Sequence, residues 1–457
     1  MERVISEPLK FNKVTAGVSR DKFFHNCCWL WLFAFFVLPD AFGFRFLFLF
    51  SAKRIMMFIC YAQILSNKDK YNKFWHAMKS VKYFNIFIIL YMFVRLYTAV
   101  FRLDINTFAG EFLDGIMVFY LFIYVLREEI EISSLLKFIY GVFLFLSIHS
   151  FIEYFTGFNI LSYLDTVGGD LSIATGVRLG LNRVTANCHH PIHFGIYMTI
   201  LFFLSCIDYK NNKLDLFYHK GAFFLALFAI YSSGSRGPLG IFLGMFIVIL
   251  LFSNKDQRIL GLLILTFSII IIAGITFVNL GNAIGRNIMR MLTASIDGIF
   301  GTTYSYQYGG ERYIDSTLYR EALSKVFKVS YFNKFIGRGI SYELSVVIDG
   351  YWLRSCDNSY VYYYIATAYP GLITFCLLFA VIIVVSTVLY VKTKYKIYIL
   401  FAITIINYMI NIRYVALMGT LMYMWMIFAM FFAVKYKLKR KKEGEEKCNL
   451  NLLKKTL

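Results

Sequence analysis

Apolar runs separated by short polar segments extend along almost the whole chain. Most runs hold about 20 residues, the length that an α-helix needs to cross the hydrocarbon core of a bilayer. Lipid-exposed backbone must satisfy its hydrogen bonds within one segment, so the pattern predicts an all-α polytopic membrane protein. We expect about twelve transmembrane helices, at residues 23–40, 44–66, 83–101, 108–126, 137–155, 191–208, 219–234, 237–253, 259–280, 358–391, 396–412 and 415–434.

Three of these runs have unusual features. The run 44–66 contains Lys53 and Arg54, and the third run contains Arg95. We expect these side chains to snorkel from helix ends to the membrane interface. The run 358–391 is longer than a bilayer needs and contains Pro370-Gly371. We expect it to begin as a short interfacial helix that turns into the membrane at this dipeptide.

Positive charges predict the orientation of the spans. If the N-terminus is cytoplasmic, the segments that face the cytoplasm carry 29 of the 47 Lys and Arg residues. Cytoplasmic loops are enriched in Lys and Arg, so both termini are predicted to be cytoplasmic. The chain then divides into a cytoplasmic segment (1–22), a nine-helix membrane region (23–280) with an outside loop (157–190), a large extracytoplasmic loop (281–357), a three-helix membrane region (358–434) and a basic cytoplasmic tail (435–457).

Composition agrees with a membrane protein and excludes an ordinary soluble domain. The chain is 59% hydrophobic and 16% charged, with a formal net charge of +20. Since the positive charges lie between spans, we assign them to membrane orientation and expect no nucleic-acid partner. No small-residue cleavage site follows the apolar run after Phe23, so we expect the first span to be retained as an anchor.

The eight cysteines are scattered and show no Cys-x-x-Cys spacing, which disfavours a metal or redox framework. Cys188 and Cys356 are both predicted to lie outside, beside candidate site segments. An oxidising compartment permits a bridge between them, so they are a candidate disulfide pair.

The loop 281–357 mixes polar, aromatic and charged residues between two apolar runs. Tyr313, Leu318 and Leu323 recur with helical spacing, which predicts that the loop is folded. A long loop in a protein of otherwise short loops is often functional. Its tyrosines and Trp352 suit stacking against sugars, although packing inside the loop would use the same residue types.

Arg236 is the strongest candidate for a ligand-binding residue. It lies in the turn SSGSRGP between two predicted spans, on the face where positive charge is disfavoured. A guanidinium matches phosphate oxygens in two contacts at once, so one function is to hold a diphosphate. The alternative is an interfacial anchor.

The loop GVRLGLNRVTANCHHP carries Arg178 and Arg183, five residues apart. The two arginines could face one anion, or bind lipid headgroups or the carbonyls of their own loop. The adjacent pair His189-His190 cannot readily share one ion, so we do not expect a metal site.

The large loop ends with Asp357-Asn358 at the start of a predicted helix. Asp357 has two interpretations, as a helix N-cap and as a general base. Arg312, Arg320 and Arg338 lie within the loop, either as surface charges or as ligands of an anion.

Several segments together resemble a known family. They are an Arg-rich loop leading into HPIHFGIYM, the turn SGSRGPLG, a large loop containing LYREAL and NKFIGRGI, and then DNSYVYYYIATAYPGL. In this order and topology they resemble the bacterial O-antigen ligase/polymerase superfamily. These membrane enzymes join glycans that are linked to undecaprenyl diphosphate.

The resemblance implies a metal-independent, C-type-like glycosyltransferase that needs no cofactor. Arg236 would bind the diphosphate, with Arg183 or Arg178 as a second arginine. The family's loop arginine would fall nearest to Arg312 or Arg320. Ligases of this superfamily carry a His-Asn pair where this chain has Asp357-Asn358, so the resemblance favours a polymerase.

We therefore expect a polymerase of undecaprenyl-diphosphate-linked repeat units (of O-antigen, capsule or exopolysaccharide) at the outer face of the bacterial cytoplasmic membrane. Its expected partners are the lipid-linked glycan, membrane lipids and a chain-length regulator. One alternative is a ligase that transfers glycan to a lipid or protein acceptor. Another is a flippase or transporter, although the two halves show no matching repeats.

Overall fold

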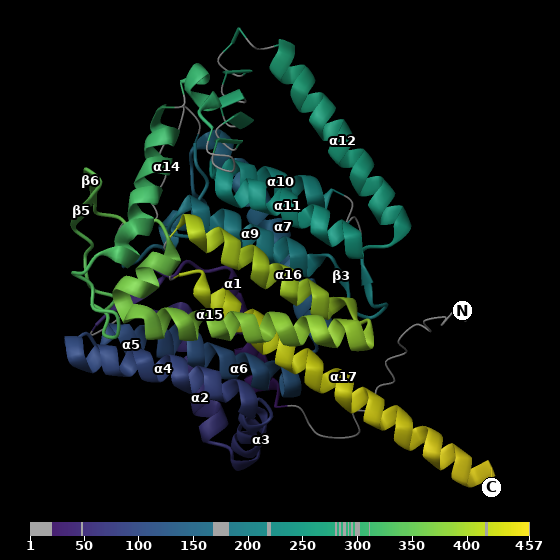
Figure 1. Cartoon of the computed structure of the whole chain (residues 1–457). Coiled ribbons are helices and arrows are strands. Elements are labelled where there is room, and N and C mark those ends of the chain that lie inside the picture. Colours follow the sequence, from purple (N-terminus) through teal and green to yellow (C-terminus); the bar gives the residue numbers. More distant parts are fainter. Residues whose placement is uncertain are drawn as a thin grey trace.

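The computed structural model describes residues 21–46, 49–167, 182–216, 221–278, 281–282, 285–286, 289–290, 292–293, 296–297, 302–309, 311–415 and 419–456. Its helices are α1 (Lys22–Phe36), α2 (Ala52–Leu65), α3 (Lys68–Lys79), α4 (Lys82–Arg102), α5 (Asn106–Glu111), α6 (Val118–Tyr124), α7 (Ile132–Thr156), α9 (Pro191–Ser205), α10 (Ala222–Ser232), α11 (Arg236–Phe252), α12 (Lys255–Val278), α14 (Glu311–Ser324), α15 (Ser359–Thr393), α16 (Lys396–Asn411) and α17 (Leu421–Thr456). Most of them pack side by side as one bundle (Figure 1).

Shorter elements connect or extend these helices. Two π-helical stretches, η1 (Phe112–Met117) and η2 (Val125–Glu129), continue α5 and α6. The 3₁₀ turns are η3 (Ile160–Leu164), η4 (Tyr304–Tyr308), η5 (Lys325–Lys328) and η6 (Ile412–Tyr414). Antiparallel pairs join β1 (Gly43–Arg45) to β2 (Leu49–Ser51), β3 (Ile207–Asp208) to β4 (Lys213–Leu214), and β5 (Val346–Ile348) to β6 (Tyr351–Leu353).

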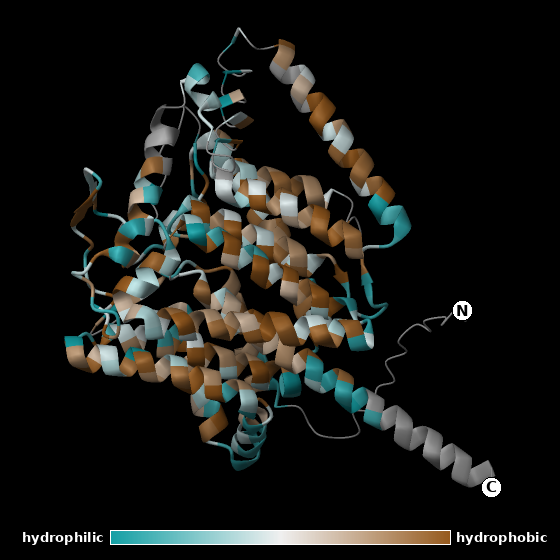
Figure 2. Cartoon of the chain, in the orientation of Figure 1, coloured by the Kyte–Doolittle hydropathy of each residue, from teal (hydrophilic) through white to brown (hydrophobic). Residues whose placement is uncertain are grey.

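Six helices in the described part of the chain are long and apolar enough to cross a membrane. They cover Lys82–Arg102, Asn106–Glu129, Ile132–Thr156, Ser359–Thr393, Lys396–Tyr414 and Leu421–Lys441. Shorter apolar helices cover Pro191–Ser205, Ala222–Ser232 and Gly237–Phe252. Brown, apolar residues cover most of the bundle in Figure 2. The all-α membrane class is confirmed, and the count of twelve spans stays a prediction.

The predicted span 44–66 differs from a continuous membrane helix. Its first part is the β1–β2 hairpin, in which Phe44 pairs with Phe50. Helix α2 begins only at Ala52 and has 14 residues, because the chain first turns back on itself before it enters the bundle.

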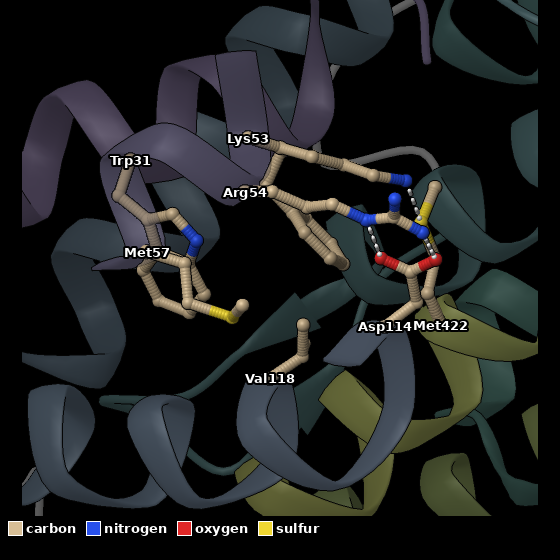
Figure 3. Close-up of a pocket in the computed structure, with 8 residues that line it drawn as sticks. Trp31, Lys53, Arg54, Met57, Asp114, Val118 and Met422 are labelled. Carbon is tan, nitrogen blue, oxygen red and sulfur yellow. Dashed lines mark hydrogen bonds and ion pairs between the residues drawn. The ribbon is translucent and has the colours of Figure 1, made fainter. Parts of the chain in front are cut away.

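Two charged residues of α2 pair inside the protein. Figure 3 shows the Arg54 guanidinium as a fork on the Asp114 carboxylate, with Nε 2.8 Å and Nη2 2.5 Å from its oxygens. Lys53 is 9% exposed and its Nζ lies 2.6 Å from Asp40. The expectation that these side chains snorkel to the interface is wrong, because the bundle itself supplies their counter-charges.

Arg95 is also not an interfacial side chain. It is fully buried, and it donates from Nε to the Thr107 carbonyl at 2.8 Å and from Nη1 to the Tyr91 hydroxyl at 3.1 Å. Its Nη2 lies 3.9 Å from Glu111, whose other oxygen accepts from the Trp425 indole at 2.5 Å. A buried charge needs such partners, and sequence spacing alone did not show them.

Segments that are predicted to be cytoplasmic meet in space. Lys70 pairs with Asp21 at 2.6 Å, and Arg127 donates to the Ser80 hydroxyl at 2.7 Å. These residues come from three predicted inside segments, so the alternation of the first spans agrees with the structure. The side of the membrane that they face stays a prediction.

Helix α15 is broken where the sequence predicts a turn. Ala368 has φ 56° and ψ −167°, which is not helical. Pro370, two residues later, has no N–H and cannot continue the helical hydrogen bonds. The predicted break is confirmed, two residues before the Pro370-Gly371 dipeptide, whereas the interfacial position of the first part stays a prediction.

The segment NKFIGRGI fills this break. The N–H groups of Arg338 and Gly339 donate to the carbonyls of Ile365 and Ala366 at 2.8 and 3.0 Å. These carbonyls would otherwise lack partners in a buried place, which is costly. At Gly337 a Cβ would collide with the Ala366 carbonyl, so only glycine allows this approach.

The described residues that precede α15 form a second, smaller hydrophobic cluster. Leu323 and Val326, from the predicted helical pattern, are both fully buried in it. The cluster consists of Ala322, Leu323, Val326, Phe332, Leu344, Leu353, Val361, Tyr364 and Ile365. It therefore ties α14 and the β5–β6 hairpin to the first half of α15.

Candidate functional site

Arg183 lies against the serine turn between α10 and α11. Its Nε donates to the Ser233 carbonyl at 3.1 Å, and its Nη2 donates to the Ser235 hydroxyl at 3.0 Å. The backbone joins at the same place, because Val184 N–H donates to the Ser232 carbonyl at 3.0 Å. Two segments that are about 50 residues apart in the sequence thus form one unit.

Glycine is required in this turn. Gly234 has φ +61°, and a Cβ there would lie 3.1 Å from the Arg183 side chain. The hydroxyls of Ser232 and Ser233 donate back to carbonyls of α10, so both buried serines are satisfied within their own helix end. The small residues therefore let the guanidinium lie directly on the backbone.

Arg236 is the first residue of α11. Helix N-termini carry unpaired N–H groups and a partial positive charge, and so favour anions. The structure thus brings the helix end at position 236 and the Arg183 guanidinium to one turn. Both belong to the predicted diphosphate site.

A buried carboxylate holds the loop that carries Arg183. Glu153, in α7, is 1% exposed and accepts from Thr185 N–H at 2.9 Å, from Thr185 Oγ1 at 3.2 Å and from Ala186 N–H at 3.0 Å. Asn159 adds a bond to the Ala186 carbonyl at 2.9 Å. Glu153 is not among the site residues predicted from the sequence, although an acidic residue inside a predicted span is itself a signal.

The start of α9 contributes histidines. His190 caps the helix by accepting from Ile192 N–H at 3.1 Å, and its ring centroid lies 5.7 Å from that of His193. Burial lowers the pKa of His190 below its ordinary value of 6.5, the neighbouring Arg183 lowers the pKa further, and Asp357 acts in the opposite direction. The neutral form of the imidazole is therefore favoured, and both Arg183 and Asp357 act on its charge.

Asp357 and Asn358 precede α15, and the structure shows which of them caps this helix. Asn358, not Asp357, is the N-cap of α15, and its side chain accepts from Tyr360 N–H at 2.9 Å. Asp357 accepts from the Ser355 hydroxyl at 2.8 Å. The N-cap interpretation of Asp357 is wrong, because the helix begins one residue later.

The connection between α16 and α17 contacts the helices that carry the candidate site residues. A Cβ at Gly237 would lie 3.7 Å from the Tyr414 ring, and the Arg320 guanidinium lies 6.0 Å from the same ring. Ser359 donates to the Val415 carbonyl at 2.7 Å. The starts of α11 and α15 and the end of α14 therefore meet around η6.

The remaining predicted arginines either lie away from the turn between α10 and α11 or fall outside the described residues. The Arg338 guanidinium lies over Tyr331 at 4.3 Å and near Tyr342 at 5.8 Å, at the break in α15. Arg312 lies in the first turn of α14. Arg178 lies outside the described residues.

The candidate disulfide does not form. Cys188 is buried and Cys356 half-buried, and both are free thiols. The Cys188 thiol faces the Asn187 side chain at 3.6 Å, whereas the Cys356 thiol faces the Asn358 carbonyl at 3.5 Å. The predicted disulfide is wrong. Both cysteines neighbour candidate site segments in the sequence, but their sulfur atoms face different residues in the structure.

The candidate site thus combines Arg183, the N-terminus of α11, His190 and Asp357, with Arg320 nearby through Tyr414. No protein-family model matches the chain, and no curated protein is similar to it.

Proposed function

We propose that the protein polymerises oligosaccharide repeat units linked to undecaprenyl diphosphate, at the outer face of the bacterial cytoplasmic membrane. The observation that supports this most is the meeting of Arg183 with the start of α11, beside a neutral histidine and a carboxylate. Cations fixed before the reaction stabilise charge on a departing phosphate oxygen.

In the proposed reaction, the bond between the anomeric carbon and the diphosphate oxygen breaks, and the diphosphate leaves as an anion. The acceptor hydroxyl forms the new glycosidic bond and loses its proton to a base. His190 and Asp357 are the candidate bases. The glycosyl diphosphate already holds the energy of the reaction, so no nucleotide is needed.

Arg236→Ala tests this proposal. We expect normal membrane insertion but only single repeat units, when the purified protein is incubated with lipid-linked repeat units and the products are separated by length. Arg45→Ala is the matched control, since Arg45 is exposed in the β1–β2 hairpin, and it should give a full ladder. Full-length polymer from an Arg236→Ala protein that is inserted normally would refute the arginine site.

A ligase is the nearest alternative, and the same assay separates the two. A null mutant of a polymerase leaves single repeat units, whereas a null mutant of a ligase leaves long polymer without its acceptor. The break in α15 is a feature that favours a transporter. Its freed carbonyls are however bonded to Arg338 and Gly339 and not left for a transported ion.

A further inference from the structure

Helix α3 presents one face to the protein and another to its surroundings. Phe74 packs against Tyr61, with ring centroids 5.6 Å apart, and Ala77 is buried. To one side of this packed face, Tyr71 and Trp75 are 43% and 46% exposed. Figure 2 shows α3 as a largely polar helix beside the apolar bundle.

Lysines border the exposed aromatic residues. Lys68 and Lys79 recur on the same face as Trp75, and the Lys79 ammonium lies 5.4 Å from the Trp75 ring centroid. Lys70 and Lys73, by contrast, pair with carboxylates at 2.6 and 2.7 Å. Lys70 and Lys73 are thus paired with carboxylates. Lys68 and Lys79 are exposed, and no carboxylate among the described residues forms an ion pair with them.

The exposed face continues into a membrane-crossing helix. Lys82 and Tyr83 open α4, and the Lys82 ammonium lies 4.9 Å from the Tyr83 ring centroid. From Tyr83 onward, α4 exposes an apolar stripe with helical spacing that includes Ile86 and Phe93. The exposed basic and aromatic residues of α3 and Lys82 are therefore followed directly by the exposed apolar stripe of α4, a helix long and apolar enough to cross a membrane.

We propose that α3 lies on the bilayer surface and binds anionic phospholipid headgroups. Tyr71 and Trp75 lie at headgroup depth, as interfacial aromatic residues do. The exposed Lys68, Lys79 and Lys82 contact the phosphates. Each lysine near an anionic surface strengthens binding by about fivefold. The inference does not depend on the proposed enzymatic function.

The first measurement tests the depth of Trp75. The full chain is placed in phosphatidylcholine bilayers with acyl chains brominated near the glycerol, and tryptophan emission is recorded for wild type and Trp75→Phe. We expect a quenched component that Trp75→Phe removes. Equal quenching in both proteins would place Trp75 in water, as in a site for a soluble partner, and would overturn the proposal.

The second measurement tests the charge. A photo-crosslinking residue replaces the exposed Asn72, and captured lipids are identified in bilayers of equal parts phosphatidylglycerol and phosphatidylcholine. We expect phosphatidylglycerol to be over-represented about fivefold or more. The triple variant Lys68→Gln, Lys79→Gln and Lys82→Gln should lower this ratio toward one, while Lys70→Gln, the matched control, should keep it. An unchanged ratio in the triple variant would overturn the proposal.

Discussion

Glu153→Gln should release the loop that carries Arg183. The carboxylate accepts from Thr185 N–H, Thr185 Oγ1 and Ala186 N–H through both of its oxygens. A glutamine keeps one acceptor oxygen but turns an NH₂ group toward the second backbone N–H. A buried N–H without an acceptor costs about 1–3 kcal/mol, and the bonds that remain lose the strength that a charged acceptor gives. We expect the docked loop to be destabilised by about 2 kcal/mol.

Hydrogen–deuterium exchange of the peptide 182–190 measures this directly. Local opening sets the exchange rate, and about 2 kcal/mol corresponds to roughly 30-fold faster exchange. Ser150→Ala is the matched control, because Ser150 is equally buried in α7 but its hydroxyl bonds only to the Ser147 carbonyl. Exchange in Glu153→Gln that stays at the rate of the Ser150→Ala control would show that the carboxylate does not hold the loop.

Three further outcomes follow from particular contacts. Arg54→Met should destabilise the protein by about 1–3 kcal/mol in thermal unfolding, because it removes the charged partner of the half-buried Asp114 carboxylate. Adding Asp114→Leu should recover most of the loss, and a double variant no better than the single one would contradict this. Gly337→Ala should detach the segment from the broken helix α15 and speed proteolysis there, whereas Gly141→Ala, whose Cβ would meet nothing, should not. The pKa of His190 is depressed, and a bound diphosphate would raise this pKa, so affinity for undecaprenyl diphosphate should increase as pH falls from about 7.5 to about 5.5. His190→Gln should remove this part of the pH dependence, and an unchanged dependence would exclude His190 as its source.

Hydrophobic pattern alone predicted much of the fold. The stretches near 83–101, 108–126, 137–155, 358–391 and 396–412 correspond to helices that are long and apolar enough to cross a membrane. Local chemistry predicted the break in α15, because a proline acts on its own helix. Such features need only neighbours along the chain, which the sequence contains.

The predictions about buried charge failed because the partners of these charges are distant along the chain. Arg95 is held by Thr107 and Glu111, and Arg54 by Asp114, 60 residues away. A charged residue in an apolar run shows that a partner or water must exist, but not which one. The disulfide prediction failed in the same way, since the sequence does not fix the distance between two thiols.

The amino-acid sequence by itself determined that this is a helical membrane protein and that Arg183 and Arg236 begin or precede helices at one predicted face. Only the tertiary structure decided that Arg183 lies on the turn before Arg236, that Glu153 holds its loop and that Asn358 caps α15. The reason is physical. Hydrophobic periodicity depends on residues three or four positions apart, whereas a site is formed by packing of helices whose residues are 30 to 170 positions apart along the chain.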